Sequence, residues 1–203
     1  MSTPDPDAEL MLAVKAGDAR AFSRLFDKYA RSIVNFAYRF VADRGRAEEL
    51  AQDIFLKVYK SAGSYEPSAK FKTYLYRIAA NHCMNEKRKG VYQAQHQSSA
   101  EEGAVELGSA DNTSPEQALH GQELARDLAA ALEALSPRER AAFSLCRFEG
   151  MAYKDIADTL ETSEAAVKSL IHRATLGVAK RLAESGAEPA EPAAGGRHGV
   201  QRV

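Results

Sequence analysis

The sequence predicts an all-α protein made of two small helical domains joined by a flexible acidic linker. Apolar residues recur at helical spacing in residues 8–89 and again in residues 118–185, and no stretch alternates as a half-buried strand would. Residues 90–117 contain almost no large apolar side chains, so burial there cannot offset the entropy of ordering the chain. We therefore expect a linker at 90–117, and a disordered tail in the Ala-, Pro- and Gly-rich residues 186–203.

Length and charge limit the possible functions. With 203 residues and 45% hydrophobic side chains, the chain has room for modest cores but not for a large enzyme body. The net charge of −1 would argue against a nucleic-acid partner if the charges were evenly spread. They are not, because Lys and Arg number 16 against 11 acids in residues 1–89, and 0 against 5 in residues 90–121. The first module is basic and the connector is acidic.

The cysteines indicate a reducing compartment. Cys83 and Cys146 form no CxxC pair and follow no secretory leader, so we expect a cytoplasmic protein. No apolar run approaches the roughly 20 residues needed to cross a bilayer, so we expect no direct membrane insertion. His82 and Cys83 are adjacent on a predicted helix and point about 100° apart, which favours a structural pair over metal ligands. We predict no metal and no cofactor.

In the first module, Gly17 is predicted to end one helix and Asp18 to be the N-cap of the next. The residues that follow at helical spacing are predicted to face a core: Phe22, Leu25, Phe26, Tyr29, Ile33, Phe36, Ala37 and Phe40. After a break at residues 43–45, a helix over 47–60 is predicted to bury Leu50, Ala51, Ile54, Phe55 and Val58. Its outer face, which is chemically suited to a partner helix, carries Glu48, Glu49, Gln52, Asp53, Leu56 and Lys57.

The helix predicted over 70–89 is basic and aromatic. It has six basic residues against one acid, and a cationic stripe of this kind can follow a phosphate backbone while rings at its edge stack on unpaired bases. The candidate DNA contacts are Tyr65, Lys70, Lys72, Tyr74, Arg77, Asn81, Asn85 and Arg88, with Tyr76 as a possible addition. A neighbouring stripe of Phe71, Leu75, Ile78 and His82 is predicted to be buried. In the alternative interpretation, the rings belong to the core and the charges are only solvated.

The second module contains a predicted helix-turn-helix. Leu124, Leu128, Leu132 and Leu135 are spaced for a buried face, and Ser136 to Glu139 forms a capping box with Pro137 in the first turn. Two apolar patterns then flank a polar break at residues 161–163. The second of these helices offers candidate major-groove contacts: Ser163, Glu164, Ala165, Ala166, Lys168, Ser169, His172 and Arg173. An ordinary helical hairpin with a solvated outer face fits this spacing equally well.

Over residues 8–184 the chain resembles the extracytoplasmic-function (ECF) group of bacterial sigma factors. The resemblance rests on motifs that occur in the family's order, namely Ala47 to Phe55 (AEELAQDIF), Phe71 to Ala79 (FKTYLYRIA), Leu135 to Arg140 (LSPRER), Glu149-Gly150, and Val167-Lys168-Ser169 with His172-Arg173-Ala174. The sequence departs from the family at Tyr74, where tryptophan is usual, at Ala152, where a capping serine is usual, and at Glu161, where a turn glycine is common.

The resemblance implies a transcription initiation factor and not an enzyme. It implies that the 47–60 helix docks on core RNA polymerase, that the 70–89 helix reads and melts promoter DNA near the start site, and that the helix-turn-helix reads the upstream element. It also implies an anti-sigma factor as a further partner. The residues leave two rivals: a free-standing helix-turn-helix regulator, and a nuclease. Against the nuclease, the sequence has no carboxylate pair flanked by His and no Gly-rich phosphate loop.

Overall fold

The structure is a computed structural model that describes the backbone of residues 5–94 and 115–185 and the side chains of residues 5–86 and 124–185. In these ranges every regular element is a helix, which confirms the all-α prediction. The predicted tail at 186–203 and residues 95–114 of the predicted linker lie outside the described residues. The described ends of the predicted linker, residues 90–94 and 115–117, are helical.

The first module consists of α1 (Pro6–Lys15), α2 (Ala19–Val41), α3 (Arg44–Lys60), a 3-10 turn η1 (Ala62–Ser64) and α4 (Phe71–Ala94). Aspartates start three of these helices. Asp5, Asp18 and Asp43 each accept a backbone N–H of the following first turn, which pairs a donor that the helix itself leaves free. The predicted N-cap at Asp18 is thereby confirmed, with its Oδ1 2.8 Å from the Arg20 nitrogen.

Two helix boundaries differ from the prediction. Helix α3 begins at Arg44 and not near Ala47, because the actual break is at Ala42, which has a φ of 54°, and Asp43 then caps the helix. Gly45 therefore lies in the first turn. Helix α4 continues to Ala94, five residues past the predicted end at Lys89. Sequence pattern indicated both helices but placed their ends poorly, because a left-handed alanine leaves no sequence signal.

The predicted core of the first module is largely confirmed. The inward stripe of α3 is buried, as are Ile33, Phe36, Ala37 and Phe40 of α2. Phe26 is an exception, since it is exposed while its ring packs against Phe55 at a centroid distance of 4.8 Å. Ile78 and His82, predicted to be buried, are only half-buried.

The second module consists of α5 (Pro115–Glu133), α6 (Pro137–Arg147), α7 (Tyr153–Leu160) and α8 (Glu164–Glu184). The capping box at Ser136 and Glu139 and the helix-turn-helix formed by α7 and α8 are confirmed. The turn between α7 and α8 is made by Glu161, which has a φ of 50°, and Ser163 caps α8. Leu124, predicted to be buried, is exposed, whereas Leu132 is buried.

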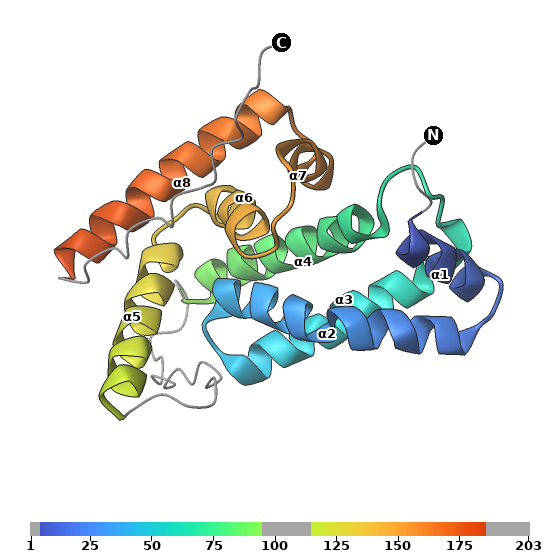
Figure 1. The fold of residues 1–203 in the computed structure, drawn as a ribbon, viewed down its shortest axis with the longest axis horizontal. Helices are drawn as coiled ribbons and strands as arrows, with labels where there is room; N and C mark the ends of the chain where they lie inside the picture. The colour runs from blue at the N-terminus through green and yellow to red at the C-terminus, as the bar shows by residue number, and fades with distance from the viewer. Residues whose placement is uncertain (1–4, 95–114, 186–203) are drawn as a thin grey trace, which may run out of the picture.

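The two modules pack against each other along α4. This helix lies between α2 and α3 on one side and α6 and α7 on the other (Figure 1). One contiguous apolar cluster joins the first module to α6 and α7, and it includes Leu145, Met151 and Ile156. A smaller cluster lies between α5, α6 and α8. The core that positions α4 is therefore shared between the modules.

Candidate nucleic-acid and polymerase interfaces

The outer face of α3 is exposed along its length. All six of the residues predicted to contact a partner are exposed, and Leu56 stands out as a large apolar side chain with 49% of its surface accessible. Glu48 and Glu49 pair with Arg44 and Arg46 of the same helix, the latter at 2.6 Å. This face therefore combines an apolar centre with flanking ion pairs.

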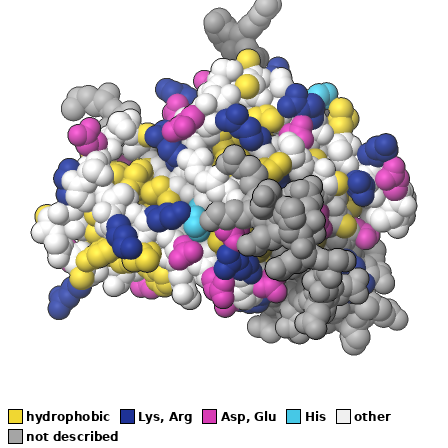
Figure 2. All heavy atoms as spheres, turned by 180° about the vertical axis from the view of Figure 1, so that it is seen from behind, with side chains coloured by type: hydrophobic (Ala, Val, Ile, Leu, Met, Phe, Trp, Pro, Cys, Tyr) yellow, Lys and Arg dark blue, Asp and Glu magenta, His cyan; other side chains and the backbone are white. Residues whose placement is uncertain are grey.

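Aromatic residues extend this face toward the end of α3. Tyr59 is exposed and its ring contacts Phe22 at a centroid distance of 5.0 Å, while Phe26 lies against Phe55. Figure 2 shows hydrophobic side chains gathered among lysines and arginines at the left of the view, on the side where α1 and the end of α3 lie. Aromatic and apolar groups at a surface supply binding energy when a partner covers them.

Helix α8, the second helix of the helix-turn-helix, presents the face that the sequence predicted. Ala166 is half-buried, and the other predicted contact residues are exposed, namely Ser163, Glu164, Ala165, Lys168, Ser169, His172 and Arg173. Val167, Ile171 and Ala174 are buried, with Ala174 in the cluster that includes α5 and α6. Arg173 pairs with Glu139 of α6 at 2.7 Å. The hydrogen bond from Ser136 and the Arg173 guanidinium hold the pKa of Glu139 below its usual range. The outer side of the N-terminal half of α8 therefore carries small, polar and basic residues, with the acid Glu164 in the first turn, and the short side chains suit approach to a major groove.

The predicted cationic stripe of α4 faces the second module. Lys70 Nζ lies 2.8 Å from Asp155 Oδ2, and this carboxylate raises the pKa of Lys70. Lys72 Nζ donates to the Glu149 carbonyl oxygen at 2.6 Å. Arg77 donates to the Asp158 carbonyl oxygen at 2.8 Å. Three of the cations expected to meet DNA are therefore bound by oxygen atoms of the segment 149–161.

Further along α4, Asn81 and Asn85 are exposed. Arg88 lies on α4 among residues whose side chains the structure does not describe. His82 is half-buried beside Lys57 and Asp53 of α3, and burial followed by the nearby Lys57 charge lowers its pKa. His82 therefore lies in the contact between α4 and α3, with its Nδ1 atom 2.5 Å from the Lys57 Nζ.

The tyrosines at the start of α4 differ in accessibility. Tyr65 is 2% exposed, and its ring packs against Tyr74 at a centroid distance of 4.9 Å and against Phe71. Tyr76 is buried as well. Neither ring is available to stack on a base in this arrangement, which corrects the expectation that they line the surface. Tyr74 remains half-exposed, with its hydroxyl 2.6 Å from the Ser61 Oγ.

Glu149 is the polar centre of the junction between the modules. Its carboxylate is 8% exposed, accepts from Arg39 at 3.1 Å, and also accepts from the Tyr76 hydroxyl. Burial lowers the pKa of Arg39, and the Glu149 carboxylate opposes that shift. Burial, with Glu149 next in importance, raises the pKa of Tyr76. The Glu149 carboxylate of the second module is therefore paired with donors from the first module.

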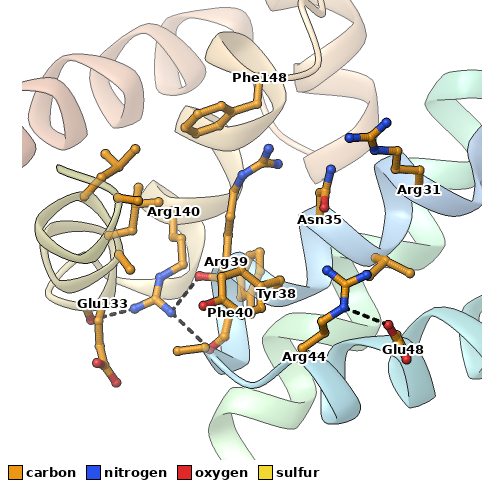
Figure 3. Close-up of a pocket in the computed structure, with 16 residues that line it drawn as sticks. Arg31, Asn35, Tyr38, Arg39, Phe40, Arg44, Glu48, Glu133, Arg140 and Phe148 are labelled. Atoms are coloured by element: carbon orange, nitrogen blue, oxygen red, sulfur yellow. Dashed lines mark hydrogen bonds and ion pairs between the residues drawn. The ribbon is translucent and has the colours of Figure 1, made fainter. Parts of the chain in front are cut away.

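Arg140 is a second polar link at this junction. It is 2% exposed, and its guanidinium donates to the carbonyl oxygens of Arg39 and Phe40 at 3.2 Å and to that of Glu133 (Figure 3). The cation thus caps the C-terminal end of α2, where free carbonyl groups favour positive charge. Sequence reasoning missed Arg39, Glu149 and Arg140 as contacts between modules, although it quoted Glu149 and Arg140 within family motifs.

A groove of about 520 Å³ opens beside this junction. Its apolar lining comes from Val34 of α2, Leu128 and Leu132 of α5 and Phe148, and the Arg39 guanidinium lies 3.9 Å from the centre of the Phe148 ring (Figure 3). Among the described residues no group of three or more His, Cys, Asp or Glu side chains is arranged to hold a metal ion. No helix in the described ranges is long and apolar enough to span a membrane.

Comparison with known proteins points to one family. A family model described as Sigma-70 region 2 matches residues 25–91, and one described as Sigma-70, region 4 matches residues 125–175. The RNA polymerase sigma-H factor of Pseudomonas aeruginosa is 33% identical over 186 residues, which cover 90% of this chain and 96% of the relative. The ECF RNA polymerase sigma factor SigE of Mycolicibacterium smegmatis is 32% identical over 174 residues, covering 85% of this chain and 66% of the relative.

A solved structure shares the fold. The sigma factor RpoE from Bartonella quintana, in complex with the anti-sigma factor NepR, matches with a TM-score of 0.65 at 23% identity, covering 81% of this chain and 98% of that one.

Proposed function

Because the chain belongs to the ECF group of RNA polymerase sigma factors, we propose which of its surfaces bind the polymerase, read the promoter and open the duplex. We assign polymerase binding and promoter melting to residues 8–89, and recognition of the upstream promoter element to residues 118–185. Residues 90–117 connect these two modules. The polymerase supplies the catalysis, so we infer that the chain is not itself an enzyme and acts in the cytoplasm with the polymerase.

The exposed outer face of α3 is the single observation that best supports a specificity subunit over a free-standing regulator. A regulator needs only its DNA-reading helix, whereas this chain exposes Leu56, one helical turn after the polar residues Gln52 and Asp53, on a helix far from α8 in the sequence. A large apolar side chain with polar neighbours is typical of the centre of a protein interface. We assign core polymerase binding to Glu48, Glu49, Gln52, Asp53, Leu56 and Lys57.

Two exposed leucines provide a matched test of this assignment. Leu56→Glu should weaken binding to core polymerase by about tenfold or more, because it places a charge at the centre of the interface. Leu12→Glu makes the same change on α1, where Leu12 is also exposed, and should leave core affinity unchanged. Both affinities would be measured by titrating labelled protein with purified core enzyme. Equal losses for both variants would refute the assignment of α3.

The cationic stripe of α4 suits melted DNA. Lys70, Lys72 and Arg77 can follow a phosphate backbone, while the Tyr74 ring offers a face to an unstacked base and the Asn81 carboxamide offers both a donor and an acceptor. We assign this role to Lys70, Lys72, Tyr74, Arg77, Asn81, Asn85 and Arg88, with Tyr65 supporting Tyr74 from beneath.

The exposed face of α8 suits an upstream duplex. We assign reading of that element to Ser163, Glu164, Ala165, Ala166, Lys168, Ser169, His172 and Arg173. Lys168→Ala should weaken protection of the upstream element by the holoenzyme in footprinting. Lys180→Ala removes the same charge from the exposed C-terminal half of α8 and serves as the control. Equal effects of the two changes would contradict the proposed position of the groove contact.

Run-off transcription tests the function as a whole. Purified protein added to core enzyme should stimulate transcription from a target duplex promoter and from the same promoter with a pre-melted bubble. Failure to stimulate either template would refute the assignment. Stimulation of the bubble template alone would place the defect in the melting step.

We also propose an anti-sigma factor as a partner. The proposal is supported by the structural neighbour RpoE, which is in complex with the anti-sigma factor NepR, and by the groove lined by α2 and α5 in this chain. The protein should co-purify with the product of an adjacent reading frame when the two are expressed together. Replacing Leu128 in the groove by glutamate should abolish that co-purification if the groove is the binding site.

A further inference from the structure

Tyr74, near the start of α4, is half-exposed, but its hydroxyl group is bound to the end of another helix. The hydroxyl oxygen lies 2.6 Å from the Oγ atom of Ser61, the residue that ends α3. The same Oγ atom lies 2.7 Å from the Lys57 carbonyl oxygen and 3.1 Å from the Val58 carbonyl oxygen. A carbonyl oxygen only accepts, so the single Ser61 hydroxyl proton is donated to α3 and the Tyr74 hydroxyl donates to Ser61. One serine therefore ties the Tyr74 ring to the end of α3.

Two buried rings pack against Tyr74 without stacking on it. The Tyr65 ring meets the Tyr74 ring at a centroid distance of 4.9 Å and an interplanar angle of 65°, and the Phe71 ring lies 6.1 Å away at 45°. A stacked partner is nearly parallel to the ring that it covers. Neither neighbour has that geometry, so neither takes the position in which an unpaired base would stack on Tyr74.

Helix α1 holds the backbone of both of these neighbours. Lys15 Nζ donates to the Tyr65 carbonyl oxygen at 2.9 Å. The Asp5 carboxylate, which also caps α1, accepts from the Phe71 backbone nitrogen at 2.7 Å. The rings beside Tyr74 are thus fixed through their backbone, and the hydroxyl contact with Ser61 fixes the far end of the Tyr74 ring itself.

We propose that Ser61 is a positioning residue for promoter melting, because its Oγ atom holds the Tyr74 ring at the angle at which an unstacked promoter base packs against it. A ring that is fixed before the base arrives loses less rotational freedom on binding, so binding is stronger. The proposal rests on the assignment of Tyr74 to melted DNA. It adds a residue of α3 that acts on melting through Tyr74 and not by contact with the DNA.

Four variants of the full chain, assembled with core polymerase, test this contact. Tyr74→Phe removes the hydroxyl group and keeps the ring, Ser61→Ala removes the acceptor, and a double variant removes both. Ser185→Ala is the matched control, because Ser185 ends α8 in the second module and donates to the Leu182 carbonyl oxygen at 3.0 Å. It therefore loses the same kind of helix-end contact as Ser61→Ala.

Three measurements separate positioning from stability. The fluorescence of 2-aminopurine in the non-template strand of a target duplex promoter follows the rate of opening. Titration with labelled core enzyme gives the affinity for polymerase, and urea denaturation gives the free energy of unfolding.

Ser61→Ala and Tyr74→Phe should each slow opening by about two- to tenfold, which is the range of one hydrogen bond. The double variant should be no slower than either single variant, because both changes break the same contact. Ser61→Thr, which keeps a hydroxyl group, should restore opening to nearly the wild-type rate. The affinity for core polymerase should be unchanged in all of these variants, and Ser185→Ala should open the promoter at the wild-type rate.

Two results would overturn the positioning role. One is an additive loss in the double variant, which would mean that Ser61 affects opening without Tyr74. The other is a wild-type rate of opening in Ser61→Ala, whatever its stability, which would reduce Ser61 to a helix cap. Tyr74→Ala tests the underlying assignment separately and should slow opening by about tenfold or more. If it does not, Tyr74 does not contact the melted strand, and the assignment and the positioning role both fail.

Discussion

Replacing Glu161 by glycine should stabilise the protein, because Glu161 occupies a backbone conformation that side chains disfavour. Its φ is 50°, and it ends α7 with its N–H bonded to the Ala157 carbonyl oxygen. A residue with a Cβ costs about 1–2 kcal/mol in the left-handed region. The greater freedom of glycine in the unfolded chain offsets about 0.5–1 kcal/mol of that gain.

The side chain of Glu161 contributes little that glycine would lose. Its carboxylate is 3.9 Å from Arg77 Nε, and the side chains of Glu161 and Arg77 are 69% and 41% exposed. Because solvent screens this ion pair, it contributes only about a few tenths of a kcal/mol to the free energy of unfolding. The net gain in the free energy of unfolding should therefore be about 0.5–1 kcal/mol. Urea denaturation followed by far-UV circular dichroism measures it.

Two further variants isolate the cause. Glu161→Ala loses the ion pair but keeps the Cβ, so it should be no more stable than wild type. Ala42→Gly relieves the same strain at the end of α2, where φ is 54° and there is no ionic side chain, so it should gain a similar amount. The reasoning fails if Glu161→Gly is no more stable than Glu161→Ala.

Three other outcomes follow from the buried and charged groups. Arg140→Met should lower the free energy of unfolding by about 2–4 kcal/mol, measured by urea denaturation, because three carbonyl oxygens lose a charged donor. A loss below about 1 kcal/mol would contradict that role of Arg140. The hydrogen bond from Ser136 lowers the pKa of Glu139 in the folded protein, so the ionised carboxylate stabilises the fold at any pH above the pKa of Glu139 in the unfolded chain. This stabilisation is lost as the pH falls through the pKa of the folded protein. Glu139→Gln should therefore lower the free energy of unfolding at neutral pH, and the difference from wild type should vanish in acid. Burial raises the pKa of Cys83 to about 12, so a thiol reagent should label the half-buried Cys146 first and react with Cys83 only after urea has unfolded the protein. Equal labelling rates of the two cysteines in the native protein would refute this expectation.

Much of the fold could be predicted because helices carry local signals. The buried stripe of α3, the capping box at Ser136 and the two helices around residues 161–163 were all indicated by spacing and cap residues. The outward residues of α3 and α8 followed from the same periodicity, because a residue that does not face the core of an amphipathic helix faces solvent or a partner.

The contacts between modules could not be predicted in the same way. Whether Glu149 meets Arg39, or Arg140 meets the end of α2, depends on how two modules separated by the linker pack, and no local pattern encodes that. Tyr65 shows the same limit, since its ring was expected at the surface and lies beneath Tyr74 instead. An aromatic ring next to a basic helix suits a stacking surface and a core equally well until tertiary packing is known.

The apolar cluster shared by the two modules has a thermal consequence. Separating the modules would hydrate side chains such as Leu145, Met151 and Ile156, and hydration of apolar surface increases the heat capacity. Contacts of this kind weaken on cooling. The apolar part of the contact between the two modules should therefore weaken as the temperature falls, whereas the polar contacts around Glu149 and Arg140 carry no such dependence on apolar hydration.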